Sequence, residues 1–144
     1  MDRTQFAVAL VAGMADALVY ADADGVIRFW NRGAARIFGY PEAEAVGQSL
    51  DIIIPASLRE RHWQGFTATM QTGRTRYGDG DLLSVPAVRK DGARISVEFT
   101  IVPFQDETGR MAGMAAIMRD VSRSFQELRS LRAEVAKLRA GGAS

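Results

Sequence analysis

An unbroken alternation of apolar and polar side chains over residues 94–101 constrains the fold of this chain more than any other feature. The apolar members are Ile95, Val97, Phe99 and Ile101. Successive residues of a β-strand point to opposite faces, so the pattern predicts a strand that buries one face and exposes the other. The turn sequences Asp91-Gly92 and Thr108-Gly109 flank this segment, and Pro103 is expected to end the strand. Short turns on both sides predict an antiparallel sheet.

The rest of the chain predicts helices around that sheet. A four-residue repeat predicts an amphipathic N-terminal helix, with the members Phe6, Leu10, Met14 and Leu18. Two β-prone runs joined by Asp24-Gly25 predict a hairpin, and short helices are expected between residues 31 and 73. Residues 83–87 alternate, whereas residues 111–118 are apolar on both faces, which predicts a central strand. This order predicts an α+β fold with the helices on one face of an antiparallel sheet.

Composition limits the function classes. The chain has 144 residues, 47% hydrophobic residues and a net charge of +1, which suits one globular domain and gives no general attraction to nucleic acid. It has no cysteine, so disulfides, cysteine-ligated metals and a flavin–cysteinyl adduct are excluded. No apolar run reaches membrane-spanning length and no secretory leader is recognisable. A cytoplasmic protein without membrane contact is the expectation.

The single histidine is the most informative candidate site residue. His62 belongs to a four-residue repeat in the segment that follows Pro55, with the members Leu58, His62, Phe66 and Met70. On a helix these side chains share one slowly turning face, so an imidazole points with apolar neighbours at whatever the helix covers. The imidazole could ligate a metal through one ring nitrogen, or it could be a core histidine with both nitrogens hydrogen-bonded.

The C-terminal segment carries a second apolar repeat. Its members, at heptad a/d spacing, are Leu128, Leu131, Val135 and Leu138. We expect a short parallel coiled coil and a homodimer held by the C-terminal and N-terminal helices. The alternative is a monomer in which both helices fold back on their own sheet.

Several short motifs, taken in order, resemble a PAS domain. They are Asp24-Gly25-Val26-Ile27, residues 31–40, Glu44-Ala45-Val46-Gly47, Arg89-Lys90-Asp91-Gly92 with Glu98, and Met118-Arg119-Asp120-Val121-Ser122. The resemblance covers roughly residues 5–122 and implies a five-stranded antiparallel sheet whose short helices enclose a ligand-sized cavity. It divides the chain into an N-terminal flanking helix (1–19), a PAS sensor domain (18–122) and a C-terminal signalling helix (123–140).

Within that family, the spacing from Pro55 to His62 is similar to the oxygen-sensing heme PAS domains of rhizobial sensor kinases. This resemblance implies a b-type heme (heme b) whose iron is ligated by His62, and a diatomic gas or the redox state as the signal. The implied packing residues are Leu58, Phe66, Met70, Leu83, Val85, Phe99 and Ile101. Met70 or another methionine could supply a sixth iron ligand.

The chain departs from that subgroup at two arginine positions. Leu83 stands where an arginine can hydrogen-bond bound oxygen, so carbon monoxide or nitric oxide would be favoured over oxygen. Ala68 stands where an arginine contacts a heme propionate, which leaves that role to Arg74 or Arg76.

Three functions remain open from the sequence. The first is a heme-based gas or redox sensor that signals to a downstream protein. The second is a PAS domain that holds another small ligand or none, and the third is a dimerisation module. Catalysis is not expected, because the carboxylates fall mainly in turns and the histidine has no evident nucleophilic neighbour.

Overall fold

The computed structural model describes residues 1–73 and 82–142. Within these ranges the strands form one five-stranded antiparallel sheet in the order β2-β1-β5-β4-β3. The strands are β1 (Ala17–Asp22), β2 (Ile27–Trp30), β3 (Leu83–Val88), β4 (Arg94–Gln105) and β5 (Met111–Asp120). The segment that is apolar on both faces, β5, lies between β1 and β4. The predicted sheet and its central strand are therefore confirmed.

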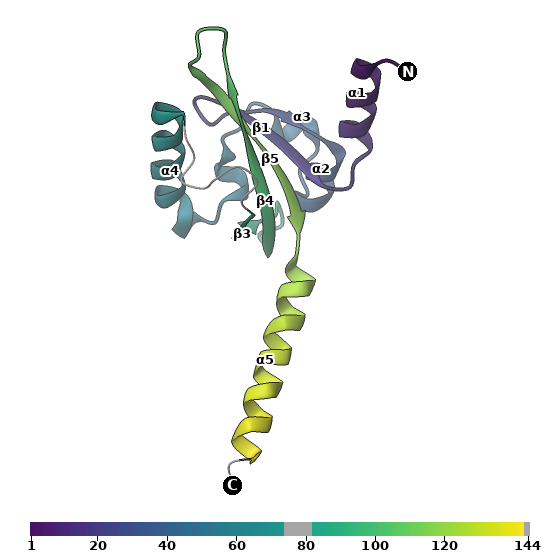
Figure 1. Cartoon of the computed structure of the whole chain (residues 1–144), viewed down its shortest axis with the longest axis vertical. Helices are drawn as coiled ribbons and strands as arrows, with labels where there is room; N and C mark the ends of the chain where they lie inside the picture. Colours follow the sequence, from purple (N-terminus) through teal and green to yellow (C-terminus); the bar gives the residue numbers. More distant parts are fainter. Residues whose placement is uncertain (74–81, 143–144) are drawn as a thin grey trace.

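Helices precede, interrupt and follow the sheet (Figure 1). They are α1 (Arg3–Gly13), α2 (Arg32–Phe38), α3 (Glu42–Ala45), the 3₁₀ turns η1 (Leu50–Ile53) and η2 (Ala56–Leu58), α4 (Arg59–Thr72) and α5 (Ser122–Gly142). The left-handed glycines Gly39 and Gly73 end α2 and α4, because only glycine adopts positive φ without strain. α5 leaves the sheet at the end of β5 and points away from the domain (Figure 1).

The core lies between one face of the sheet and the short helices. Val19, Val97 and Met118 of the central strands pack with Ile37 and Phe38 of α2, and all of them are buried. Burying such side chains stabilises a fold by about 1.5–3 kcal/mol each. This layer fixes the face of the sheet on which a ligand cavity can form.

Asn31 joins the N-terminal part of the chain to the core. Its side-chain oxygen accepts hydrogen bonds from the backbone N–H groups of Leu18 and Ala34, both at 2.9 Å. Its amide nitrogen donates to the carbonyls of Val11 (3.0 Å) and Asp16 (3.1 Å). Asn31, the N-cap of α2, therefore also joins the end of α1 to β1.

Two element boundaries were predicted wrongly. The N-terminal helix was expected to include Met14 and Leu18, but α1 ends at Gly13 and Leu18 lies in β1. Leu18 pairs with β5 in the sheet, and this pairing outweighs the helical repeat. β4 continues past Pro103 to Gln105, because its pairing with β5 continues through Pro103, opposite Met114, to Gln105, opposite Met111.

The opposite face of the sheet carries an aromatic cluster made of Tyr20, Phe29 and Phe104. The Tyr20 ring lies 5.6 Å from Phe29 and 5.3 Å from Phe104, centroid to centroid. Phe29 is 64% exposed and Phe104 is 45% exposed. We call these three residues the outer aromatic cluster.

Candidate functional site

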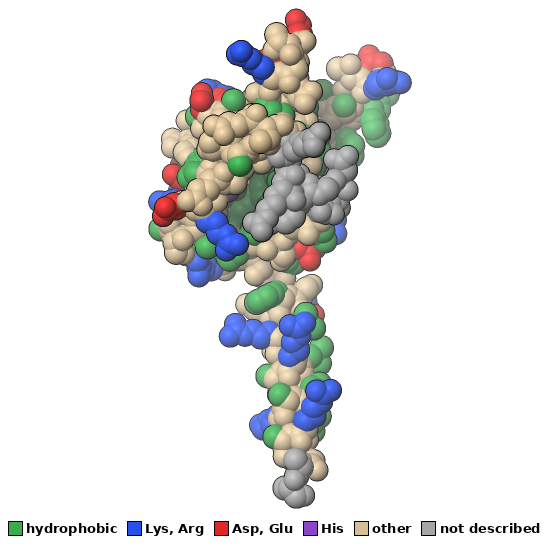
Figure 2. All heavy atoms as spheres, turned by 60° about the vertical axis from the view of Figure 1, so that its left-hand side comes forward, with side chains coloured by type: hydrophobic (Ala, Val, Ile, Leu, Met, Phe, Trp, Pro, Cys, Tyr) green, Lys and Arg blue, Asp and Glu red, His purple; other side chains and the backbone are tan. Residues whose placement is uncertain are grey.

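A hydrophobic cavity of about 140 Å³ lies between α4 and the sheet. Its lining comes from the chain segments around β1, η1, α4, β3, β4 and β5. Figure 2 shows the face with α4 turned forward and a hollow floored by hydrophobic side chains. Among the described residues that line the cavity, every side chain except His62 is hydrophobic. One imidazole in an apolar chamber is the distinctive chemistry of this site.

His62 projects from the second turn of α4. Within the described part of the chain, its Nδ1 atom is buried and has no hydrogen-bond partner. Burial lowers the pKa of His62 below its usual 6.5, and the nearby Asp51 carboxylate opposes that change in part. The imidazole is therefore favoured in its neutral form, which is the form that ligates metals. A buried unpaired ring nitrogen is uncommon in folded proteins, so it marks a site that can accept a further group.

Aromatic and polar contacts hold the N-terminal half of α4 in place. The indole Nε1 of Trp63 donates to the Asp51 carboxylate at 2.7 Å. The Trp63 ring fills the space beside Gly25, where a side chain on the β1–β2 turn would collide with it. The rings of His62 and Trp63 lie 4.7 Å apart, edge to face. These contacts set the position of His62 over the sheet.

Five of the predicted site residues line the same cavity. They are His62, Phe66, Val85, Phe99 and Ile101. They come from α4, β3 and β4, so the fold brings together segments that are distant in sequence. Their role in binding stays a prediction.

Three other predicted site residues do not line the cavity. Leu58 precedes α4, Leu83 pairs with Phe99 at the start of β3, and Met70 lies in a groove with Gln105 and Met111. Residues four apart on a helix are offset by about 40°, so the ends of a three-step stripe point about 120° apart. Only its middle, His62 and Phe66, faces the cavity.

The two arginines expected near a propionate, Arg74 and Arg76, fall outside the described residues. Their assignment stays a prediction.

Sequence analysis missed part of the lining. Val19 and Ala21 of β1 and Met114 and Met118 of β5 also face the cavity. Their period-two spacing was visible, but the β1–β5 pairing that places them opposite α4 depends on long-range contacts. The cavity methionines are thus Met114 and Met118, and not Met70.

The described residues contain no group of three or more histidine, cysteine, aspartate or glutamate side chains that could hold a bare metal ion. A single imidazole suits a metal that arrives with most of its ligands already bound, such as the iron of a porphyrin.

The family described as the PAS fold matches residues 11–124. The chain belongs to this family. The match covers the whole sheet and the helices that surround the cavity, so the expected PAS fold is confirmed.

Three curated proteins are similar to this PAS domain. An uncharacterized protein of Azorhizobium caulinodans is 32% identical over 81% of the chain. The sensor protein FixL of Bradyrhizobium diazoefficiens is 29% identical over 88% of the chain, and the oxygen sensor protein DosP of Escherichia coli is 29% identical over 81%. The chain spans 16%, 26% and 14% of the length of these proteins.

Solved structures agree on the fold. The PAS domain of a Colwellia psychrerythraea protein matches with a TM-score of 0.72 at 22% identity, over 85% of this chain and 99% of that one. No helix among residues 1–73 and 82–142 is both long enough and apolar enough to span a membrane. The chain is thus a PAS domain, and two of its relatives are described as sensor proteins.

Proposed function

We propose that this PAS domain is a sensor that binds a b-type heme through His62 and responds to a diatomic gas or to redox state. Two observations on His62 carry the proposal: it lines a cavity whose other described lining residues are hydrophobic, and its buried Nδ1 has no hydrogen-bond partner among the described residues. Similarity to a sensor protein and to an oxygen sensor protein agrees with it. A bound heme would supply an iron atom that takes up the gas. No catalytic step is part of this proposal.

The lining residues fit a porphyrin in their chemistry. Neutral imidazole is a common axial ligand of heme iron, and flat apolar surfaces pack against the macrocycle. The cavity of about 140 Å³ is smaller than the roughly 300–1,000 Å³ of typical small-molecule sites. Heme binding therefore requires α4 to move away from the sheet. Trp63 and Asp51 anchor the half of α4 that carries His62, so the movement is expected at the other end.

The apolar walls set the expected gas preference. Among the described residues, the lining around Val85, Phe99 and Ile101 is apolar and offers no hydrogen-bond donor to bound oxygen. Oxygen gains more from such a donor than carbon monoxide does, so weak oxygen binding and fast autoxidation are expected. Leu83 does not line the cavity, but it pairs with the lining residue Phe99 in the sheet. The longer side chain of Leu83→Arg should therefore reach the cavity and raise oxygen affinity. An unchanged affinity would show that position 83 does not face the gas.

The connection between β5 and α5 provides a route for output. Met118 lines the cavity, and Asp120 two residues later accepts hydrogen bonds from the Ser122 backbone N–H (2.9 Å) and hydroxyl (2.6 Å). Ser122 Oγ also accepts from the backbone N–H of Ser96 on β4 (2.9 Å). A movement of the β5 residues that line the cavity can thus be transmitted to the first turn of α5 through these hydrogen bonds. We propose that a homodimer, held by the terminal helices, reads this shift and passes it to a downstream protein.

Visible absorption spectroscopy tests the heme proposal. Purified protein titrated with hemin should develop a Soret band at one heme per chain. His62→Ala should lose the band, whereas Gln64→Ala, on the exposed side of the same helix, should keep it. A wild-type spectrum that stays that of free hemin, or a band that survives in His62→Ala with unchanged shape, would overturn the assignment.

The small cavity favours one competing function, a PAS domain that binds a compact apolar ligand. In that case His62 would donate to or accept from the ligand and would not bind iron. Mass spectrometry of an organic extract from purified protein separates the two. A copurifying small molecule together with failed hemin titration would support this second function.

A further inference from the structure

Gly65 divides α4 into two parts that are held differently. Before it, Trp63 donates to the Asp51 carboxylate at 2.7 Å, and Arg59 donates to the Asp51 backbone carbonyl at 3.3 Å. After it, Phe66 lines the cavity and is 7% exposed. The first part of α4 is therefore joined to η1 by hydrogen bonds, and Phe66 contributes apolar packing to the second part.

No contact among the described residues requires a glycine at position 65. A Cβ atom placed there would have no described atom of another element within 4 Å, and Gly65 does not have a positive φ. Gly25 is different, because a Cβ atom there would collide with the ring of Trp63. A glycine inside a helix disfavours the helical state by about fivefold relative to alanine. The effect of Gly65 is therefore to weaken α4 at this one point.

A side-chain hydrogen bond disturbs the helix at the same peptide group. The Thr69 hydroxyl donates to the backbone carbonyl of Gly65 at 3.0 Å. In an α-helix this carbonyl is also the acceptor for the Thr69 backbone N–H, so two donors share one oxygen. Threonine bonds of this kind often bend helices, and kinks occur where a side chain enters the backbone ladder. Both features lie at the boundary between the anchored part of α4 and Phe66.

We propose that α4 is a hinged lid, which bends at Gly65 and moves Phe66 away from the sheet to admit a ligand. The inference rests on the proposed function in one respect, since it requires that a ligand enters this cavity. His62 lies before the hinge, so it keeps its place over the sheet while Phe66 moves. The imidazole is thus positioned before the ligand arrives, and Phe66 controls entry.

Moving the glycine along α4 tests the hinge without changing the composition of the helix. In Gly65→Ala/Ala68→Gly the new glycine replaces an exposed alanine whose carbonyl accepts the same kind of bond, from the Thr72 hydroxyl at 2.8 Å. The weak point then lies after Phe66, so Phe66 should stay with the anchored part. Helix propensity alone predicts no difference from the natural chain, whereas a hinge at Gly65 predicts slower opening.

Thiol labelling measures the opening without a ligand, because the natural chain has no cysteine. Ala21→Cys places a thiol in the cavity lining, at a residue that is 2% exposed. Ala34→Cys places one in the core at α2, outside the cavity lining, and reports unfolding of the whole domain. With an aromatic disulfide reagent, the first thiol should react about tenfold faster than the second, since local opening is more frequent than global unfolding.

The glycine variant should change only one of these two rates. In Gly65→Ala/Ala68→Gly, labelling of Ala21→Cys should be slowed by about fivefold, which is the helix preference removed from position 65. Labelling of Ala34→Cys should stay unchanged, because the total helix propensity of α4 is the same.

Stopped-flow absorbance gives the same comparison with hemin as the ligand. Hemin uptake by Gly65→Ala/Ala68→Gly should be slowed by about fivefold. The final Soret band should match that of the natural chain, because His62 lies in the anchored part. Gly13→Ala, at the end of α1, is the matched control, since a Cβ atom there also meets nothing within 4 Å. It should leave the uptake rate unchanged.

The outcomes separate the lid from the proposed function. Slower Ala21→Cys labelling after the glycine is moved, together with a spectrum that stays that of free hemin, would support the lid and reject the heme. A Soret band with labelling and uptake rates that do not depend on the position of the glycine would keep the heme and overturn the lid. Labelling of Ala21→Cys no faster than that of Ala34→Cys would also overturn it, because α4 would then open only when the whole domain unfolds.

Discussion

The sequences of α4 and α5 contain the same kind of apolar repeat, but α4 packs on the sheet and α5 is exposed to solvent. Each has apolar side chains at three- or four-residue spacing. α4 lies on the sheet with Phe66 only 7% exposed, whereas Leu138 in the stripe of α5 is 71% exposed. The difference shows that periodicity predicts an apolar face on a helix and leaves open what that face packs against.

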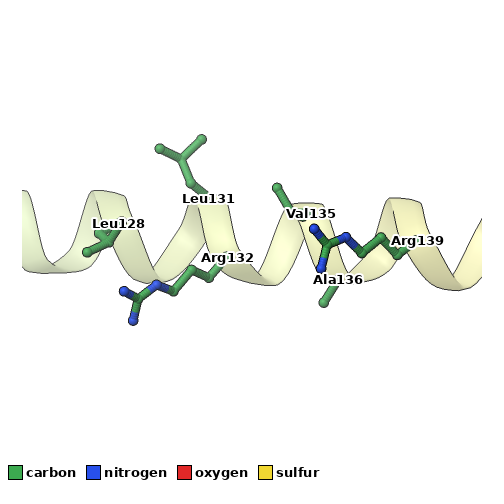
Figure 3. Close-up of a pocket in the computed structure, with 6 residues that line it drawn as sticks. All are labelled: Leu128, Leu131, Arg132, Val135, Ala136 and Arg139. Carbon is green, nitrogen blue, oxygen red and sulfur yellow. The ribbon is translucent and has the colours of Figure 1, made fainter.

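Connections to the sheet account for the difference. α4 follows η1 and η2, and Trp63 in its first half donates a hydrogen bond to Asp51 of η1. Among the described residues, the hydrogen bonds that join α5 to the sheet lie at its first turn. Its stripe, which includes Leu128, Leu131 and Val135 (Figure 3), is therefore available to a second chain. Four predictions sharpen or break this comparison.

The largest expected effect separates buried from exposed apolar residues. Phe66→Ala should lower the free energy of unfolding by about 3 kcal/mol, because it enlarges a cavity in the core. Leu131→Ala, measured below the concentration at which dimers form, should change it by less than about 0.5 kcal/mol. Urea unfolding followed by tryptophan fluorescence measures both. Equal losses would mean that α5 packs on its own domain.

A smaller loss is expected where α4 is anchored. Trp63→Phe removes the indole donor to Asp51 and keeps an aromatic ring. Unfolding free energy should fall by about 1–2 kcal/mol, since the acceptor is a charged but partly exposed carboxylate. The counterpart in α5 is Arg123→Ala, which breaks only an exposed ion pair and should cost about 0.5 kcal/mol or less. Similar costs at both sites would contradict the proposed anchor.

Acid should destabilise the packing of α4 on the sheet and should leave α5 unaffected. Burial lowers the pKa of His62 below the 6.5 of an exposed histidine, so below that pH the unfolded chain binds a proton that the folded chain resists. Stability should therefore fall as pH drops through 6.5 toward the lower folded pKa. His62→Gln should flatten this part of the stability–pH curve. An equally steep curve in that variant would assign the effect to other groups.

The smallest expected effect is that of salt on the α5 dimer. In a parallel dimer held by α5, heptad spacing places Glu127 and Glu134 of one helix near Arg132 and Arg139 of the other. Raising ionic strength from ~50 to ~500 mM shortens the Debye length and screens these Glu–Arg pairs. Each exposed pair contributes about 0.2–0.5 kcal/mol, so association should weaken a fewfold. Glu127→Arg/Glu134→Arg should show the reverse, with salt strengthening its residual association. The same trend in both proteins would exclude the proposed pairs.

Much of the fold could be predicted because its signals are local. The alternation around Val97, the turn at Asp24-Gly25 and the cap at Asn31 each specify their own conformation. Element boundaries were predicted wrongly where pairing with a distant strand decides the backbone conformation. Leu18 is an example, because it pairs with Ile117 in β5. The same limit applied to the cavity, because the lining of β1 and β5 faces α4 only after the sheet has formed.

The sequence by itself determined the PAS fold, the absence of thiol chemistry, the single imidazole and the charges that flank the heptads. These properties depend on residue types and on spacing along one element. Only the tertiary structure decided three properties of residues 1–73 and 82–142: His62 has a buried nitrogen without a partner, Met114 and Met118 line its cavity and Met70 does not, and α5 is exposed. Burial depends on which distant segments pack together, and a helical or strand period carries no information about that choice.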